Sequence, residues 1–299
     1  MDVLFCSVND WANVGALFAK ALRTVGVDAV SAVRRQHGWG YPDKSKIWKD
    51  VASLQALATQ SKAVVMMHSE LFAGLHLEGK RGGVFHGGSR YRRYKEKLNP
   101  RFNAVCDVTL VQTADLLNKG AKNPVWVMPP VDVEALKPQY WSLTDTLKYA
   151  HYPSNPRFKG SGAIKATAAK MGVDFRCSLS ILPHAKHIDR MRKCDVYIER
   201  MALEREGKPT GVWGMSAMEA AALGKIVISN DLWRERYEKE FGDCPLIVAN
   251  SRPELSMAIL YLKGARRQDL EELRKQTREW VVAKHSFEPV GARLKEVLL

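Results

Sequence analysis

Short apolar runs alternate with helical segments along the whole chain, which is the pattern of a doubly wound α/β sheet. In the first part of the chain, the expected strands span residues 3–8, 27–33, 63–68, 83–86, 108–113 and 124–128. In the second part they span residues 148–152, 175–182, 196–199, 225–229 and 245–248. The pattern therefore predicts an α/β protein with two sets of parallel strands.

Two adjacent prolines separate these sets of strands. Pro129 and Pro130 stiffen the chain just before Val131 and Asp132. A chain of 299 residues can hold two domains of ordinary size. We expect one domain over residues 1–132, a second over residues 133–284, and a final segment over residues 285–299. Ser251-Arg-Pro-Glu254 is a capping box that begins a helix, and the last two helices are expected at residues 268–284 and 288–297.

A glycine-bearing turn precedes a helix of small apolar residues between Gly211 and Gly224. The turn lets a ligand approach the backbone, so that amides near Met215 and Ser216 can bind an anion at the helix N-terminus. Glu219 lies about one turn into this helix, where a carboxylate needs hydrogen-bond donors such as ribose hydroxyls. The alternative is a capped helix whose glutamate only supports its first turns.

The same segment resembles the donor-binding signature of the large retaining glycosyltransferase family with the GT-B fold. In that family, a Glu-Gly-Phe-Gly turn precedes a second glutamate and a small-residue helix that ends in Gly-Lys-Pro-Val. The matching residues are Trp213, Gly214, Glu219, Gly224, Lys225 and Val227. One position differs: the first glutamate of the family, which lies near the transferred sugar, is replaced by Gly211.

The resemblance implies two Rossmann-like doubly wound domains that face an interdomain cleft, with the last helix packed against the N-terminal domain. It also implies a nucleotide-sugar donor, with UDP-sugars the first expectation, transfer to an acceptor hydroxyl with retention, and no required metal. Glu219 would hold the ribose, and Gly214, Met215 and Ser216 would line the donor site. If the reaction instead inverts the anomeric centre, a carboxylate base is needed in the first domain, and Asp10 is the nearest candidate.

A second segment of the C-terminal domain carries two cations in a loop shaped by proline and glycine. Ser154, Arg157, Lys159 and Gly160 follow the first strand of that domain. Taken alone, the two cations are ordinary surface charges. Beside the glycine turn, they resemble the arginine and Lys-Gly pair that hold the donor pyrophosphate, where they would stabilise the charge that grows on the leaving diphosphate. Arg157 and Lys159 are therefore predicted to bind the donor and to be catalytic.

The N-terminal domain offers two further candidates at the carboxyl ends of its strands, where parallel sheets bind ligands. Asn13-Val14-Gly15 opens the first helix and resembles the family's N-terminal glycine loop, so Gly15 is predicted to face the donor. His86, followed by two glycines, resembles the histidine that contacts the transferred sugar, and it is the third predicted catalytic residue. The alternatives are an ordinary strand-to-helix turn and a structural histidine.

The net charge of +14 makes a polyanionic partner worth testing. Cations are concentrated at Lys80, Arg81, Arg90, Arg92, Arg93, Lys95, Lys97 and Arg101, with Glu96 as the one acid among residues 80–101. Tyr91 and Tyr94 could stack on bases there, so Arg90, Tyr91, Arg92, Arg93 and Lys95 are predicted to bind the acceptor. In the alternative, Tyr91, Tyr94 and Leu98 share one helical face and pack inward.

The first expected acceptor is a hydroxymethylated pyrimidine in DNA, as the resemblance in kind to bacteriophage DNA glycosyltransferases implies. The alternatives are a lipid or cell-envelope glycan acceptor at a membrane surface, a small-molecule acceptor, and a non-catalytic protein that binds nucleotide sugars or nucleic acid. Five scattered cysteines, no signal peptide and no apolar run long enough to span a membrane indicate the cytoplasm, which would be that of the host for a phage protein. No partner protein is expected.

Overall fold

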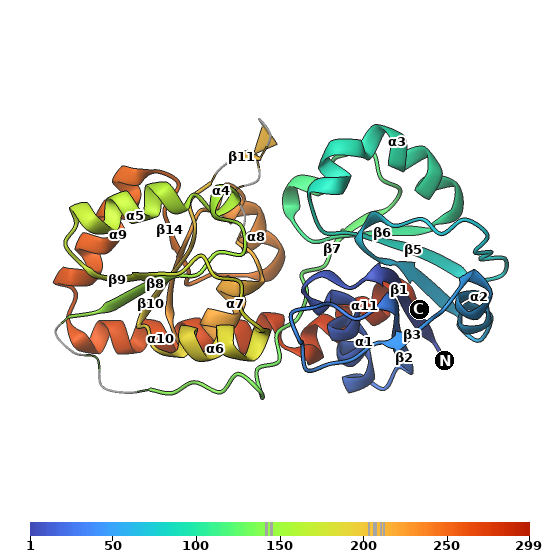
Figure 1. Ribbon diagram of the computed structural model, residues 1–299, viewed down its shortest axis with the longest axis horizontal. Coiled ribbons are helices and arrows are strands. Elements are labelled where there is room, and N and C mark those ends of the chain that lie inside the picture. Colours follow the sequence, from blue (N-terminus) through green and yellow to red (C-terminus); the bar gives the residue numbers. More distant parts are fainter. Residues whose placement is uncertain (141–142, 144–145, 203, 206–207, 210, 212) are drawn as a thin grey trace. The chain divides into compact units, whose positions relative to one another are not determined.

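The computed structural model describes all residues except 141–142, 144–145, 203, 206–207, 210 and 212. It divides into two compact units (Figure 1). The first contains Met1–Pro130 together with His285–Leu299, and the second contains Val131–Lys284. Both units are α/β structures built on a parallel sheet.

The first unit has a seven-stranded parallel sheet with the order β3-β2-β1-β4-β5-β6-β7. Its strands are β1 (Val3–Asn9), β2 (Ala29–Arg35), β3 (Lys46–Ile47), β4 (Ala63–Met66), β5 (Arg81–His86), β6 (Val108–Val111) and β7 (Pro124–Trp126). Its helices are α1 (Val14–Thr24), α2 (Val51–Thr59), α3 (Ser89–Val105) and α11 (Phe287–Leu298), with short 3-10 turns at Trp11–Asn13, Met67–Ser69 and Ala114–Leu116. The sequence did not predict β3, because this exposed edge strand has no apolar run and is ordered by pairing with Ala32 and Val33 of β2.

The last helix completes the core of the first unit. Val290, Leu294 and Leu298 of α11 are buried in one cluster with residues of the sheet and of α1. A side chain at Gly291 would bring its Cβ within 2.1 Å of the Ala21 carbonyl oxygen, so the glycine permits the close approach of α11 to α1. This packing buries apolar surface that the helix would otherwise expose to water.

The second unit has a five-stranded sheet with the order β14-β13-β10-β8-β9. Its strands are β8 (Lys148–His151), β9 (Asp174–Cys177), β10 (Val196–Arg200), β13 (Ile226–Ser229) and β14 (Ile247–Val248), and a separate two-stranded ribbon pairs β11 (Glu204–Arg205) with β12 (Lys208–Pro209). Its helices are α4 (Pro156–Lys159), α5 (Ser161–Lys170), α6 (His184–Arg192), α7 (Met215–Ala222), α8 (Arg234–Phe241), α9 (Arg252–Gly264) and α10 (Arg267–His285). Ser251 caps α9 as predicted, because its hydroxyl accepts a hydrogen bond from the Glu254 amide.

Candidate functional site

The glycine turn leads directly into α7, and aromatic residues pack against it. Gly214 is the N-cap of α7, and no side chain caps this helix end. Gly224 ends the helix in a left-handed conformation with φ of +67°. Trp213 is buried against Tyr237 and Trp280. The turn is therefore anchored by the aromatic packing of Trp213, and Val212 lies outside the described residues.

A buried carboxylate that the sequence did not identify, that of Glu199, contacts both Lys159 and the glycine turn. The ammonium group of Lys159 is paired with Glu199, the penultimate residue of β10, whose side chain is fully buried. The Glu199 carboxylate also accepts hydrogen bonds from the hydroxyls of Ser229, at 3.0 Å, and Ser216, at 3.4 Å. An added Cβ at Gly214 would lie 3.3 Å from both Glu199 Oε1 and Lys159 Nζ, so the glycine gives this pair its space.

The ion pair keeps Glu199 charged in spite of its burial. Burial acts to raise the pKa of Glu199, but the charges of Lys159 and Arg200 and the hydrogen bonds from Lys159 and Ser229 outweigh it, so the pKa lies below its usual value. The only signal in the sequence was the position of Glu199 at the carboxyl end of a strand. That position is common to structural and functional residues alike.

Glu219 is also held by a partner from another helix. Its Oε1 atom lies 2.7 Å from Nε2 of His184, the first residue of α6, and both side chains remain partly accessible. Burial acts to lower the pKa of His184, but the hydrogen bond and charge of Glu219 outweigh it and raise the pKa. His187, one turn further along α6, feels the charges of both Glu219 and Lys159, while burial lowers its pKa to about 4. Lys159 and Glu219, far apart in sequence, therefore border the same region of the second unit.

The loop before Lys159 places the other predicted donor residues at the surface. Ser154 and Arg157 are exposed, and Arg157 forms no ion pair with any residue that the structure describes. Asn155 caps α4, and Gly160 ends it with φ of +70°. A Cβ at Gly160 would lie 3.0 Å from the Met201 backbone carbon, so the loop packs closely on the segment after β10. Of the two cations, Lys159 lies beside Gly214 at the N-terminus of α7, where a cation suits a diphosphate. The role of Arg157 there stays a prediction.

In the first unit, the predicted helix N-terminus at Gly15 already binds an anion of the protein. The Asp10 carboxylate accepts hydrogen bonds from the amides of Gly15 and Ala16, each at 2.9 Å. Asp10 also lies 3.0 Å from Nε2 of His68, and its side chain is nearly fully buried. The amide of Gly15 is therefore committed to Asp10 in this structure.

His86 lies inside the first unit. It has no exposed surface, its Nδ1 atom lies 2.8 Å from the Ser69 hydroxyl, and its ring stacks on Tyr91 with 3.8 Å between ring centroids. Its Nε2 atom is buried without a hydrogen-bond partner, and burial lowers the pKa of His86 to about 3. The ring is therefore neutral. The contact of His86 with the transferred sugar stays a prediction, and because the ring is buried, its surroundings would have to move apart for a sugar to reach it.

The predicted acceptor segment divides into buried and exposed residues along α3. Tyr91 is fully buried and donates its hydroxyl hydrogen bond to Asn99. Arg92 forms a two-point ion pair with Asp115, with distances of 2.7 and 2.8 Å. Arg90 and Arg93 are exposed, and Lys95 pairs with the adjacent Glu96. Tyr91 therefore follows the inward-packing alternative, and Arg92 holds the fold, while Arg93 lies over the ring of Tyr94 at the surface.

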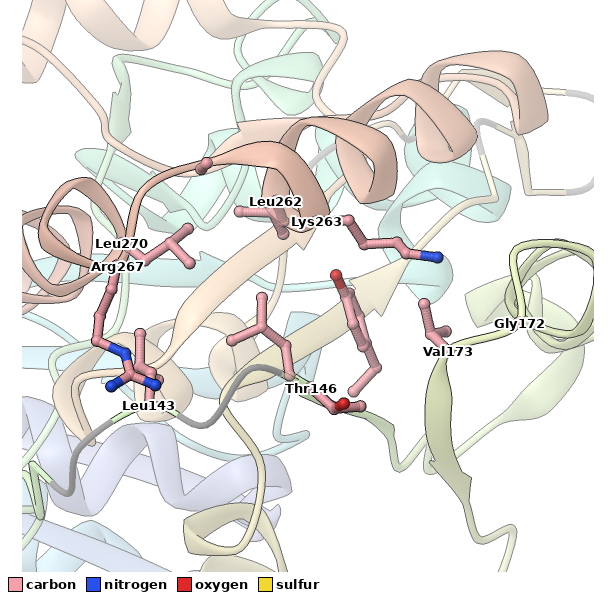
Figure 2. A pocket seen from close by; sticks show the side chains of 11 residues that line it. Leu143, Thr146, Gly172, Val173, Leu262, Lys263, Arg267 and Leu270 are labelled. Atoms are coloured by element: carbon pink, nitrogen blue, oxygen red, sulfur yellow. The ribbon is translucent and has the colours of Figure 1, made fainter.

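A cavity of about 410 Å³ opens elsewhere in the second unit (Figure 2). Its wall includes Leu143, Val173, Leu262 and Leu270, with the charged groups of Lys263 and Arg267 at its edge. None of the predicted site residues lines it. It borders the apolar core of the second unit, and it does not contribute to the donor site.

Comparisons with known proteins match this architecture only at the level of structure. No protein-family model and no curated protein sequence matches the chain. Sucrose-phosphate synthase from Thermosynechococcus elongatus has 12% identity and a TM-score of 0.65, with coverage of 99% of this chain and 98% of that one. HepE from Anabaena, solved in complex with UDP-glucose, has 10% identity and a TM-score of 0.70, with coverage of 100% and 99%. A glycosyltransferase from Rickettsia africae ESF-5 has 12% identity and a TM-score of 0.62, with coverage of 99% and 97%. The chain therefore has the GT-B fold, with two Rossmann-like domains, which the sequence predicted.

Proposed function

We propose that this protein is a glycosyltransferase that moves a sugar from a nucleotide-sugar donor, a UDP-sugar in the first instance, to an acceptor hydroxyl. The observation that carries the proposal is the grouping of Lys159, Glu219 and the uncapped N-terminus of α7 in the second unit. These groups provide a cation and backbone amides for a diphosphate and a carboxylate for ribose. The structure of HepE with UDP-glucose supports this choice of donor, because the two chains share a fold over their whole length.

In the proposed complex, Arg157 and Lys159 bind the diphosphate and stabilise its charge as it leaves. Gly214, Met215 and Ser216 bring backbone amides to the phosphates, Gly160 shapes the loop that carries Lys159, and Glu219 accepts a hydrogen bond from the ribose. His86 and Gly15, both committed to internal contacts here, stay predicted contacts of the transferred sugar and of the donor. We propose retention of anomeric configuration because the glycine turn resembles that of retaining enzymes.

The proposed acceptor is a hydroxymethylated pyrimidine in DNA. The net charge of +14 and the exposed guanidinium groups of Arg90 and Arg93 support binding of a polyanion. No helix in the described part of the chain is both long and apolar enough to cross a bilayer.

The deciding experiment incubates the protein with a mixture of nucleotide sugars and either hydroxymethylated DNA or a lipid extract. Mass spectrometry then detects any added sugar, and NMR of the product reports its anomeric configuration. We expect sugar on the DNA and none in a reaction with Lys159→Ala. Sugar on lipid alone would replace the DNA acceptor, and the absence of UDP binding in calorimetry would overturn the proposed function itself.

A further inference from the structure

Backbone strain in the first unit is concentrated where the chain reverses its direction across the sheet. The strands run outward from β1 to β2 and β3, and the chain then returns to place β4 on the other side of β1. Just after β1, Ala12 and Asn13 have φ of 56° and 59°, and just after β4, His68 and Ser69 have φ of 57° and 60°. Left-handed residues other than glycine are costly, and such strain is concentrated at functional sites. The reversal point is also where α/β sheets bind ligands.

The strained turns bring two titratable side chains together. Asp10 uses its carboxylate for the amides of Gly15 and Ala16 and for Nε2 of His68. This contact assigns the proton of a neutral His68 ring to Nε2, which leaves Nδ1 as an acceptor. Among the described residues, Nδ1 of His68 has no hydrogen-bond partner, and the atom is not one of the fully buried polar atoms that lack a partner. Solvent therefore reaches Nδ1. An oriented imidazole with one open nitrogen is suited to accept a hydrogen bond from a ligand hydroxyl.

An aromatic surface lies next to this pair, formed by Trp11, His37, Trp39 and Tyr41, and it is called the Trp11 surface below. Ring centroids are 5.0 Å apart for Trp11 and His37, 4.8 Å for His37 and Trp39, and 5.7 Å for His37 and Tyr41. His37 is within electrostatic reach of both Asp10 and His68. Trp11 is 54% exposed, so its ring is accessible to a ligand.

Exposed cations flank the Trp11 surface in the sequence, at the end of β2 and just before and within β3. Arg34, Arg35, Lys44 and Lys46 are all exposed. The one acid between them, Asp43, lies 3.3 Å from the ammonium group of Lys20. Accessible aromatic rings with cations nearby in the chain are the combination that binds single-stranded nucleic acid, because bases stack on the rings and the phosphates pair with the cations. This surface supplies the stacking that the buried ring of Tyr91 does not.

We propose that the Trp11 surface and the Asp10–His68 pair form the acceptor site, and that its ligand is an unpaired nucleotide of DNA. The base stacks on Trp11 or Trp39, the neighbouring phosphates lie against Arg34 and Arg35, and a hydroxyl on the base donates to Nδ1 of His68. This inference rests on the proposed function for its biological meaning. Its binding step is measurable without any sugar transfer.

The test measures the binding of the whole protein to a fluorescent single-stranded oligonucleotide of about twelve nucleotides, close to the footprint of one such surface. Trp11→Ala with Trp39→Ala should weaken binding roughly 5- to 150-fold for each base that loses its stacking partner. Tyr261→Ala is the matched control, because this tyrosine is 60% exposed on α9 of the second unit and should bind as the wild type does. Circular dichroism and the thermal midpoint confirm that each variant is folded.

A second comparison isolates His68. His68→Gln should weaken binding to an oligonucleotide with a hydroxymethylated base and leave binding to the unmodified oligonucleotide unchanged. Equal DNA affinity of the wild type and the double tryptophan variant would overturn the proposal. Quenching of tryptophan fluorescence by a hexose phosphate, with no response to DNA, would overturn the choice of ligand. UDP binding in the same preparations tests the proposed function separately, because its residues lie in the second unit.

Discussion

The Lys159–Glu199 pair provides the most quantitative prediction, because its two members differ in burial. The Glu199 side chain is fully buried, whereas that of Lys159 is 19% exposed. Lys159→Met leaves a buried carboxylate without its cation, which costs about 3–5 kcal/mol. Glu199→Gln keeps a polar partner for the Ser229 hydroxyl and lets the ammonium group turn to water, so we expect a cost of about 1 kcal/mol. The lysine variant should therefore be the less stable of the two.

Thermal unfolding translates these costs into midpoints. For a unit of this size, 1 kcal/mol lowers the midpoint by about 2–4 °C, so Lys159→Met should lose roughly 6–20 °C and Glu199→Gln about 2–4 °C. Because the two units need not unfold together, the transition of the second unit is first identified in the wild type by its upward shift on addition of UDP. Lys170→Met, a change at an exposed lysine of α5, is the matched control and should leave the midpoint unchanged.

The pH dependence provides a second check on the same pair. In the wild type the pKa of Glu199 is lowered, so its stabilising contribution is present above the unfolded value and is lost as the pH falls through the folded value. In Lys159→Met, burial raises the pKa of Glu199, and protonation relieves the penalty. The gap between the wild type and this variant should therefore be largest near neutral pH and close as the pH falls towards about 4. Equal losses for both variants, or a gap that does not change with pH, would refute the reasoning.

Three further predictions concern the turn and its carboxylate. Glu219→Ala should weaken UDP binding roughly 10- to 150-fold in calorimetry, because a hydrogen bond to a charged group is lost; unchanged affinity would remove Glu219 from the site. The raised pKa of His184 means that its contact with Glu219 stabilises the protein most at about pH 6 and less as the pH rises through the folded value. Chemical unfolding of His184→Ala at several pH values tests this, and a constant difference from the wild type would contradict it. Gly211→Ala should destabilise the protein by about 1–3 kcal/mol, because its Cβ would lie 2.4 Å from Leu232 Cγ, and Leu232→Ala should restore part of that loss if the clash is its cause.

The packing at Gly211 also gives a physical reason for the departure from the family signature. The Gly211 carbonyl accepts a hydrogen bond from the Leu232 amide at 2.6 Å, and the Leu232 side chain fills the space that a side chain at residue 211 would need. A glutamate there would require this contact to open. The sequence showed that the carboxylate was missing, but only the structure shows which neighbour takes its place.

Local sequence patterns determined most of the secondary structure and the fold class. Buried strands such as β1, β4 and β13 are continuous apolar runs, and helix ends such as Ser251 and Gly224 carry their own signals. The edge strand β3 was missed because a two-residue exposed strand has no pattern of its own. These features depend on neighbours in the sequence, which is why the sequence alone is sufficient for them.

The partners of the charged residues were decided by the tertiary structure. Sequence analysis selected Lys159 and Glu219, but it did not identify Glu199 or His184, which hold them. It also took Tyr91 and Arg92 as surface residues of a cationic helix, whereas the ring is buried and the guanidinium group is paired with Asp115. Ion pairs and stacking contacts join residues from separate elements, and their energies depend on distance and burial. Both quantities exist only once the sheets and helices have packed.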